Sequence, residues 1–227
     1  MGRNSSVMPV KLLECSDFVP PYSRFGQISF CLTQGEWICI SGPSGVGKSS
    51  LLFALAGLIN PISGKIQHFG SERPILGSVS LRQFRRNLVH FVPQSLPLFP
   101  QLDVLHNVLF VQRLLGDGVS PDACRQLLIK LGLQGRLEFF PSQLSIGEKQ
   151  RVCVARGLAT NAPVLLIDEP TSNLDRDCVT SLVQIFRETT QVGRALLVVS
   201  NDPRFTPFAD RVMSLDYAEN SRSSDAS

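Results

Sequence analysis

The stretch GPSGVGKSS, residues 42–50, decides the fold that the rest of the sequence must satisfy. It fits the pattern G-x-x-x-x-G-K-[ST] in full. Glycines let a backbone wrap closely around phosphate groups and turn its N–H groups inward, and the start of the following helix adds a favourable partial charge. We therefore expect a phosphate-binding loop here. The residues expected to contact a nucleotide are Gly42, Pro43, Ser44, Gly45, Val46, Gly47, Lys48, Ser49 and Ser50.

Two side chains of this loop have individual roles in the prediction. Lys48 would place a compact cation against the β and γ phosphates of a nucleotide, and the hydroxyl of Ser49 is a suitable Mg²⁺ ligand. A chance glycine-rich turn is the alternative, but the flanking segments argue against it. Residues 28–41 alternate apolar and polar around a turn, as two strands would, and the periodic apolar run 51–59 predicts a helix that Asn60-Pro61 ends.

The remaining segments predict an alternation of strands and helices. Strands are predicted at 65–70, 90–93, 163–168 and 194–200, and helices at 104–115 and 121–133. Strands that alternate with helices are typical of a parallel sheet with helices on both faces. The two helices belong to a helical insertion between Pro97 and Gln143.

The strand predicted over VLLID ends in an acidic pair, Asp168 and Glu169. Sheets of this class bind ligands at the carboxyl ends of their strands, where the chain can turn so that both carboxylates reach one site. Asp168 suits the Mg²⁺ shell, and Glu169 would orient or deprotonate an attacking water molecule. A strand ending in Asp-Glu is unspecific by itself, so this assignment depends on the phosphate-binding loop upstream.

The composition excludes several other classes of protein. Hydrophobic residues make up 43% and charged residues 18% of the chain, as in a folded domain, and the net charge of +3 is too small to indicate nucleic acid as a partner. The arginine cluster at 81–87 favours a solvated helix face over a contact with a phosphate backbone. The richest apolar runs, 50–59 and 195–200, are shorter than the roughly 18 residues of a spanning helix, so we expect the chain not to cross a membrane by itself.

The stretch LSIGEKQR, residues 144–151, predicts a helix that starts with a capping box, because Glu148 follows Ser145 at the required spacing. The exposed N–H groups and the hydroxyl of such a helix start would also suit a phosphate. The phosphate-binding loop already supplies a cradle for one nucleotide. A second phosphate-binding helix start therefore makes sense if it faces a nucleotide held by another copy.

With these motifs in this order, the sequence resembles the ATP-binding subunits of ABC transporters over about residues 10–215. Gln94 in FVPQS is similar to the family's Q-loop glutamine, and LSIGE at 144–148 is similar to its signature motif. SNLD at 172–175 is similar to the D-loop, with Asp175 in place. Each short motif is unspecific alone, whereas their order and spacing together are highly specific.

The resemblance implies an α/β fold of the P-loop NTPase (RecA-like) type. A parallel sheet core would carry an antiparallel β subdomain and an inserted α-helical subdomain. The whole chain, 1–227, would be a single ABC ATPase domain. Its parts would be a core at about 8–95 and 155–217, a helical subdomain at about 96–154 and a polar tail at 218–227.

The resemblance also implies an ATPase that works as a head-to-tail homodimer or heterodimer. ATP and Mg²⁺ on one subunit's loop would be covered by Ser145 and Gly147 of the other, and Asp175 would complete that contact. The implied catalytic residues are Glu169, Lys48, Gln94 and Asn201, and the implied metal ligands are Ser49, Gln94 and Asp168.

A separate transmembrane permease would use this ATP-driven dimer closure to move a substrate. The helical insertion and the Gln94 loop would contact it, and the apolar run 96–108 would form either that contact or subdomain core. The protein would then lie peripherally at the cytoplasmic face of the cell (inner) membrane, where six widely spaced cysteines predict free thiols. A slow or regulatory ABC ATPase in a membrane complex, of the cell-division type, is the alternative.

The sequence departs from the family at three positions. Ile146 and Glu148 replace a glycine and a glutamine of the usual signature, and Asn201 replaces a histidine that contacts the γ-phosphate. Asparagine has a shorter reach and cannot carry a proton, so we expect weak to moderate hydrolysis. The family also places an aromatic residue against adenine. Phe18 and Tyr22 are both candidates, and the spacing favours Phe18.

Overall fold

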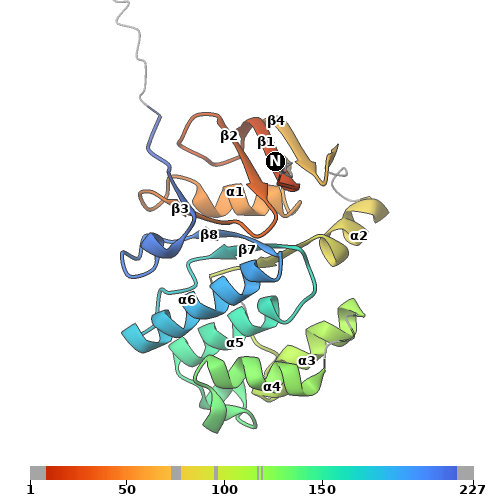
Figure 1. Ribbon diagram of the computed structural model, residues 1–227, viewed down its shortest axis with the longest axis vertical. Coiled ribbons are helices and arrows are strands. Elements are labelled where there is room, and N and C mark those ends of the chain that lie inside the picture. The colour runs from red at the N-terminus through yellow and green to blue at the C-terminus, as the bar shows by residue number, and fades with distance from the viewer. Residues whose placement is uncertain (1–8, 73–77, 95–96, 117, 119, 219–227) are drawn as a thin grey trace, which may run out of the picture.

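A computed structural model of the protein describes residues 9–72, 78–94, 97–116, 118 and 120–218 (Figure 1). Its centre is a parallel sheet of five strands in the order β6–β7–β8–β3–β9. These strands are Val89–Val92, Val164–Asp168, Ala195–Val199, Trp37–Ser41 and Arg211–Ser214. All residues of β7 and β8 are buried, because helices cover both faces of the sheet at its centre. The predicted parallel sheet is therefore confirmed.

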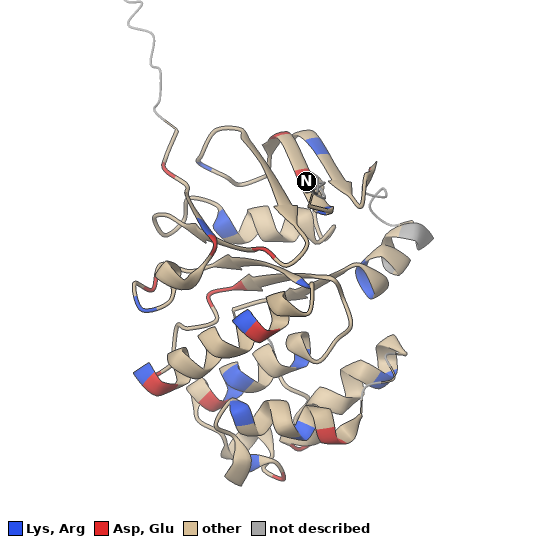
Figure 2. Ribbon diagram, in the orientation of Figure 1, with Lys and Arg blue, Asp and Glu red and all other residues tan. Residues whose placement is uncertain are grey.

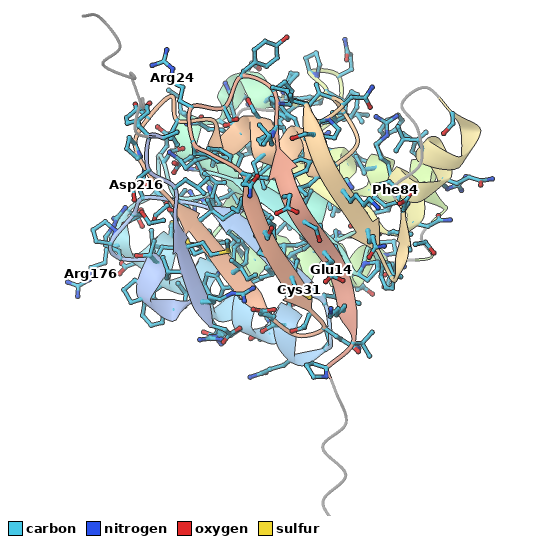
Figure 3. All side chains as sticks on the ribbon, turned by 90° about the horizontal axis from the view of Figure 1, so that it is seen from above. Glu14, Arg24, Cys31, Phe84, Arg176 and Asp216 are labelled. Atoms are coloured by element: carbon cyan, nitrogen blue, oxygen red, sulfur yellow. The ribbon has the colours of Figure 1, made fainter. Side chains whose placement is uncertain are left out.

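A second, antiparallel sheet lies above the first and has the order β2–β1–β4–β5. Its strands are Ile28–Thr33, Lys11–Val19, Ser63–His68 and Ser71–Glu72. Glu14 of β1 and Cys31 of β2 are partners across this pair and lie on neighbouring strands in Figure 3. The strands β2 and β3 follow each other in the chain but belong to different sheets, so the turn between them carries the chain into the parallel sheet.

The described residues also form the α-helices α1 (Lys48–Leu55), α2 (Val79–Asn87), α3 (Val104–Leu115), α4 (Pro121–Lys130), α5 (Ile146–Leu158) and α6 (Arg176–Gln191). Helix α1 lies between the two sheets, whereas α5 and α6 cover the other face of the parallel sheet (Figure 1). Helices α3 and α4 pack against α5 on its far side. Short 3₁₀ turns occur at Gln134–Arg136, Pro141–Gln143 and Thr206–Phe208.

Two hydrophobic clusters hold these layers together, one on each face of the parallel sheet. Between the sheets, Leu13 and Leu32 of the antiparallel sheet pack with Leu51 of α1. On the other face, the Trp37 ring lies 4.9 Å from Phe205, measured between ring centroids, and the same cluster continues through α5 into α3 and α4. Trp37 has no exposed surface, as expected for a core residue.

Several element boundaries differ from those predicted, and glycines account for two of them. Helix α1 ends at Leu55 because Gly57 takes a left-handed conformation with φ 69°, and α4 ends at Lys130 shortly before Gly132, with φ 73°. The apolar run 96–108 contributes to the core through Leu98, Val104 and Val108. Of the two predictions for this run, these buried residues favour the one in which it forms subdomain core. Leu96 lies outside the described residues.

Charged residues of both signs are interspersed along α4, α5 and α6 (Figure 2). In the arginine cluster of α2, Arg86 is exposed and its Nε donates to the carbonyl oxygen of Leu115 at 2.8 Å, while the side chain of Arg82 lies outside the described part of the structure. None of the helices formed by the described residues combines the length and the apolar character needed to span a membrane.

Candidate functional site

The glycine-rich loop leaves the parallel sheet at the end of β3 and enters α1. Gly47 precedes the helix with φ 113°, and a Cβ there would lie 2.7 Å from the Cα of Ser23, so only glycine fits. Val46 points the other way, into the core between the sheets, and has no exposed surface. Its carbonyl oxygen accepts from the backbone N–H of Arg24 at 2.8 Å. The loop is thereby anchored on both sides.

A cavity of about 380 Å³ opens beside this loop at the carboxyl end of the sheet. Its lining residues are Tyr22, Ser44, Gly45, Gly47, Lys48, Ser49, Ser50, Gln94, Asp168 and Glu169. The structure thus brings together most of the predicted loop residues, the acidic pair and Gln94, which follows β6. The predicted contacts Gly42, Pro43 and Val46 do not line the cavity.

Lys48 is the first residue of α1, and its side chain extends back to the start of the loop. Its side chain is largely buried, and its ammonium donates to the carbonyl oxygens of Gly42 at 2.7 Å and Pro43 at 3.0 Å. Both acceptors belong to the loop itself, so the positive charge is held where the loop curves. This arrangement favours an anionic ligand in the cavity.

Asp168 is the last residue of β7 and faces the same cavity. Burial raises the pKa of its carboxyl, while a hydrogen bond with the Ser49 side chain and the nearby Lys48 ammonium oppose that shift. Its Oδ1 atom is buried and has no hydrogen-bond partner among the described residues. An orphaned carboxylate oxygen beside a hydroxyl is a donor set that suits a hard divalent cation such as Mg²⁺, so these residues fit the metal predicted here.

Glu169 follows directly and adopts a left-handed backbone conformation with φ 44°. Its N–H donates to the carbonyl oxygen of Val199 at 2.9 Å, and its carbonyl oxygen accepts from Gln150 Nε2 at 3.4 Å. Burial raises the pKa of the carboxyl, and the Lys48 ammonium lowers it. A carboxylate shifted upwards in this way is a better general base near neutral pH than an ordinary glutamate. Gln150 was missed from the sequence because its partner is a backbone atom.

The ABC transporter family matches residues 25–172, which include the loop, the acidic pair, Gln94 and the LSIGE stretch. The chain belongs to this family.

Individual proteins with similar sequences are also ATP-binding proteins of this family. Over 211 residues, this ABC protein is 36% identical to the lipoprotein-releasing system ATP-binding protein LolD of Idiomarina loihiensis, covering 88% of this chain and 92% of LolD. It is 37% identical over 191 residues to the putative hemin import ATP-binding protein HrtA of Staphylococcus haemolyticus, covering 83% and 86% of the two chains. Other relatives are longer: the chain spans 58% of an uncharacterised ABC transporter ATP-binding protein of Mycobacterium tuberculosis, with 38% identity over 194 residues that make up 83% of this chain.

Solved structures of ABC transporter cassettes also superpose on this chain. The dimeric structure of the bacterial ABC transporter cassette MJ0796 superposes with a TM-score of 0.81 at 26% identity, covering 90% of this chain and 94% of that one. A dimeric post-hydrolysis state of the same ATP-binding cassette, bound to ADP and Pi, gives a TM-score of 0.82 at 26% identity and covers 91% and 96%. The P-loop NTPase fold is confirmed, and the chain is an ABC ATPase.

The signature region of this ABC ATPase lies apart from the cavity. Ser145 caps α5 and forms the predicted capping box with Glu148. Gly147 follows, and a Cβ there would lie 2.6 Å from the carbonyl oxygen of Asn173, so close packing against the segment 172–175 requires glycine. Asp175 caps α6 by accepting from the N–H of Cys178 at 2.8 Å. Ser145, Gly147 and Asp175 do not line the cavity of their own chain.

Asn201 follows β8, where the family has its histidine. Its side chain does not line the cavity but bonds to the backbone of Gly42, at the start of the loop. A further contact missed from the sequence comes from Tyr217, whose hydroxyl donates to the carbonyl oxygen of Ser44 at 3.0 Å. No sequence signal links Tyr217 to the loop, because the two residues come together only through the course of the chain after β9.

The structure corrects the preference for Phe18 as the adenine-stacking residue. Phe18 lies in β1 with no exposed surface and packs in the core between the sheets, so its ring is not accessible to a ligand. Tyr22 is 85% exposed and lines the cavity. The spacing argument failed because β1 carries an irregularity between Cys15 and Phe18, which shifts the register of the strand.

Tyr22→Ala is expected to weaken binding of both ATP and ADP by about 5- to 150-fold, because stacking of a base on an aromatic ring contributes about 1–3 kcal/mol. Tyr22→Phe, which retains the ring, is the matched control and should bind as the parent does. Phe18→Ala should instead lower the free energy of unfolding by about 3–5 kcal/mol. Equilibrium nucleotide titration and urea unfolding separate the two effects; unchanged affinity in Tyr22→Ala would exclude Tyr22 as the stacking residue.

Proposed function

We propose that this ABC ATPase hydrolyses ATP in the cavity beside the loop, and that it does so as the energising subunit of a transporter whose membrane-spanning part is a separate protein. The observation that carries the proposal is the convergence of Lys48, Ser49, Gln94, Asp168 and Glu169 on one cavity. Four separate segments of the chain supply the loop, Tyr22, Gln94 and the acidic pair.

Different side chains have different roles in the proposed hydrolysis. The loop N–H groups and the Lys48 ammonium bind the β and γ phosphates and stabilise charge that develops on them. Asp168 and Ser49, with Gln94 nearby, would hold Mg²⁺, which supplies charge neutralisation at the phosphate oxygens. Glu169 accepts a proton from the attacking water, and the oxygen of that water bonds to the γ phosphorus as the bond to ADP breaks. The products are ADP and inorganic phosphate.

A second subunit completes the site in this proposal. Ser145, Gly147 and Asp175 lie apart from the cavity of their own chain, while the first turn of α5 is accessible, with Ile146 70% exposed. Placed over a partner's nucleotide, this helix start would offer N–H groups and the Ser145 hydroxyl to the γ phosphate. The dimeric state of the related cassette MJ0796 supports this arrangement for a homodimer or a heterodimer.

The membrane partner is proposed to dock beside the loop that carries Gln94. A groove of about 500 Å³ is lined by residues that follow α1 and by residues of α2, β6 and α3, and β6 is the strand that leads to Gln94. Leu58 and Leu114 give it exposed apolar surface, and Arg85 and Arg86 add positive charge. These features suit an amphipathic cytoplasmic helix with acidic residues. The division into core, helical insertion and tail stated above, and the location at the cytoplasmic face of the inner membrane, are parts of the same proposal.

ATP turnover with and without the membrane partner tests this function. The purified protein is expected to release phosphate from ATP, and EDTA is expected to stop the release because the metal ligands lose their ion. A polytopic membrane protein should co-purify, and its transported solute should stimulate turnover. A membrane partner that leaves turnover slow and insensitive to solute would favour the regulatory alternative. Absence of turnover under all these conditions would contradict the proposal.

A further inference from the structure

Asn201 makes a two-bond contact with a single backbone residue. Its Oδ1 accepts from the N–H of Gly42 at 2.9 Å, and its Nδ2 donates to the carbonyl oxygen of Gly42 at 2.9 Å. The orientation of the amide is fixed by chemistry, since a backbone N–H only donates and a carbonyl oxygen only accepts. Both backbone polar groups of Gly42 are therefore paired with one side chain.

Gly42 is constrained from its other side as well. Its φ of 150° lies in a region that L side chains rarely adopt, and a Cβ there would overlap the carbonyl oxygen of Leu215. Gly42 is the first residue of the loop and its carbonyl oxygen also accepts from the Lys48 ammonium. The orientation of this one residue thus sets the direction of the loop and the place of its positive charge.

Asn201 is itself held firmly at the end of β8. The preceding residue, Ser200, has no exposed surface, and its N–H donates to the carbonyl oxygen of Ile40 at 3.0 Å. Strands β3 and β8 are parallel neighbours, so Gly42 after one and Asn201 after the other lie side by side. The amide therefore joins the ends of two adjacent strands of a rigid sheet.

We infer that Asn201 is a positioning residue that holds Gly42, and through it the phosphate-binding loop and Lys48, in the arrangement that receives the phosphates common to ATP and ADP. This role differs from contact with the γ phosphate. The oxygen and nitrogen of the asparagine amide point to the same side, whereas the two ring nitrogens of a neutral imidazole point in diverging directions, so histidine cannot pair with both groups of Gly42 as asparagine does. The inference rests on the proposed nucleotide site.

If Asn201 has this role, removing its side chain should lower the affinity for ADP and for ATP by the same factor, whether or not a γ phosphate is present. Without the two hydrogen bonds to Gly42, a smaller fraction of molecules holds the loop in the arrangement that binds phosphates. The apparent affinity of every ligand that binds to this arrangement falls by that fraction. Loss of two hydrogen bonds corresponds to about a tenfold change. Asn201→Ala should therefore bind ADP and ATP each about tenfold more weakly, raise the KM for ATP by about the same factor and leave kcat within about twofold.

The experiment measures dissociation constants for ADP and ATP, with steady-state kinetics, on the full chain. Asn201→Leu is similar in size, carries no charge and lacks both the donor and the acceptor, so it should show the same joint loss and serves if the alanine variant folds poorly. Asn87→Ala, an exposed asparagine at the end of α2, is the matched control. Weaker ATP binding with unchanged ADP binding would overturn the inference in favour of γ-phosphate contact, and unchanged binding of both would overturn it outright. A parent protein that binds neither nucleotide would instead overturn the proposed function.

Discussion

Glu169→Gln is expected to lower ATP turnover by about 10²- to 10⁴-fold, which is the contribution of a positioned general base. Glutamine keeps the size and the left-handed backbone of the parent residue but cannot accept the proton of the attacking water. Binding of ATP should persist, because Lys48 and the loop are unchanged. The same variant, saturated with Mg·ATP, should accumulate as a dimer, since closure is proposed to precede hydrolysis.

Phosphate release in the steady state and light scattering with ATP or ADP measure these two effects. Glu188→Gln is the matched control, because Glu188 is an exposed residue of α6 that pairs with Lys130 at 2.6 Å away from the cavity. That control should turn over ATP as the parent does. Turnover of Glu169→Gln near the parental rate would remove Glu169 from the role of general base, and a strictly monomeric variant would remove the head-to-tail dimer.

The second large effect is expected from Lys48→Met. Methionine fills the buried space of the lysine stem but lacks the ammonium that bonds to Gly42 and Pro43 and would contact the phosphates. Hydrogen bonds to charged groups contribute about 1.5–3 kcal/mol, so affinity for ATP should fall about 10- to 100-fold. Turnover should fall further, because charge that develops in the transition state also loses its partner.

Nucleotide titration and turnover at saturating ATP check this prediction. Lys65→Met, on the exposed surface of β4, is the matched control and should behave as the parent does. A thermal unfolding midpoint within a few degrees of the parent would show that the loop variant remains folded. Retention of parental affinity and turnover in Lys48→Met would place the phosphates elsewhere than in the cavity beside the loop.

Much of the fold could be predicted from the sequence because its central strands are continuous apolar runs. The strands β7 and β8 are buried along their whole length and appear in the sequence as such runs. Helix α6 was missed although Val179, Leu182 and Phe186 carry a helical period and are buried. Strand β1 is a different case, because its alternation is broken near Asp17, which has a φ of 49°, and its pattern alone does not predict a strand.

The candidate site was predictable where its residues are contiguous and unpredictable where the fold brings distant residues together. The loop and the acidic pair are local motifs, and the structure places most of their residues on one cavity. The partner of Asn201 is Gly42, separated from it by most of the chain, and only the pairing of β3 with β8 makes them neighbours. The choice between Phe18 and Tyr22 likewise depends on a strand irregularity that spacing does not reveal.

The left-handed backbone of Glu169 carries an energetic cost. A residue other than glycine in this conformation costs on the order of 1–3 kcal/mol, and the bonds to Val199 and Gln150 hold it there. A glycine at this position would relieve the strain while removing the carboxylate. The backbone conformation that places the Glu169 carboxylate at the cavity therefore lowers the conformational stability of the protein. Stability and activity make opposite demands on this one residue.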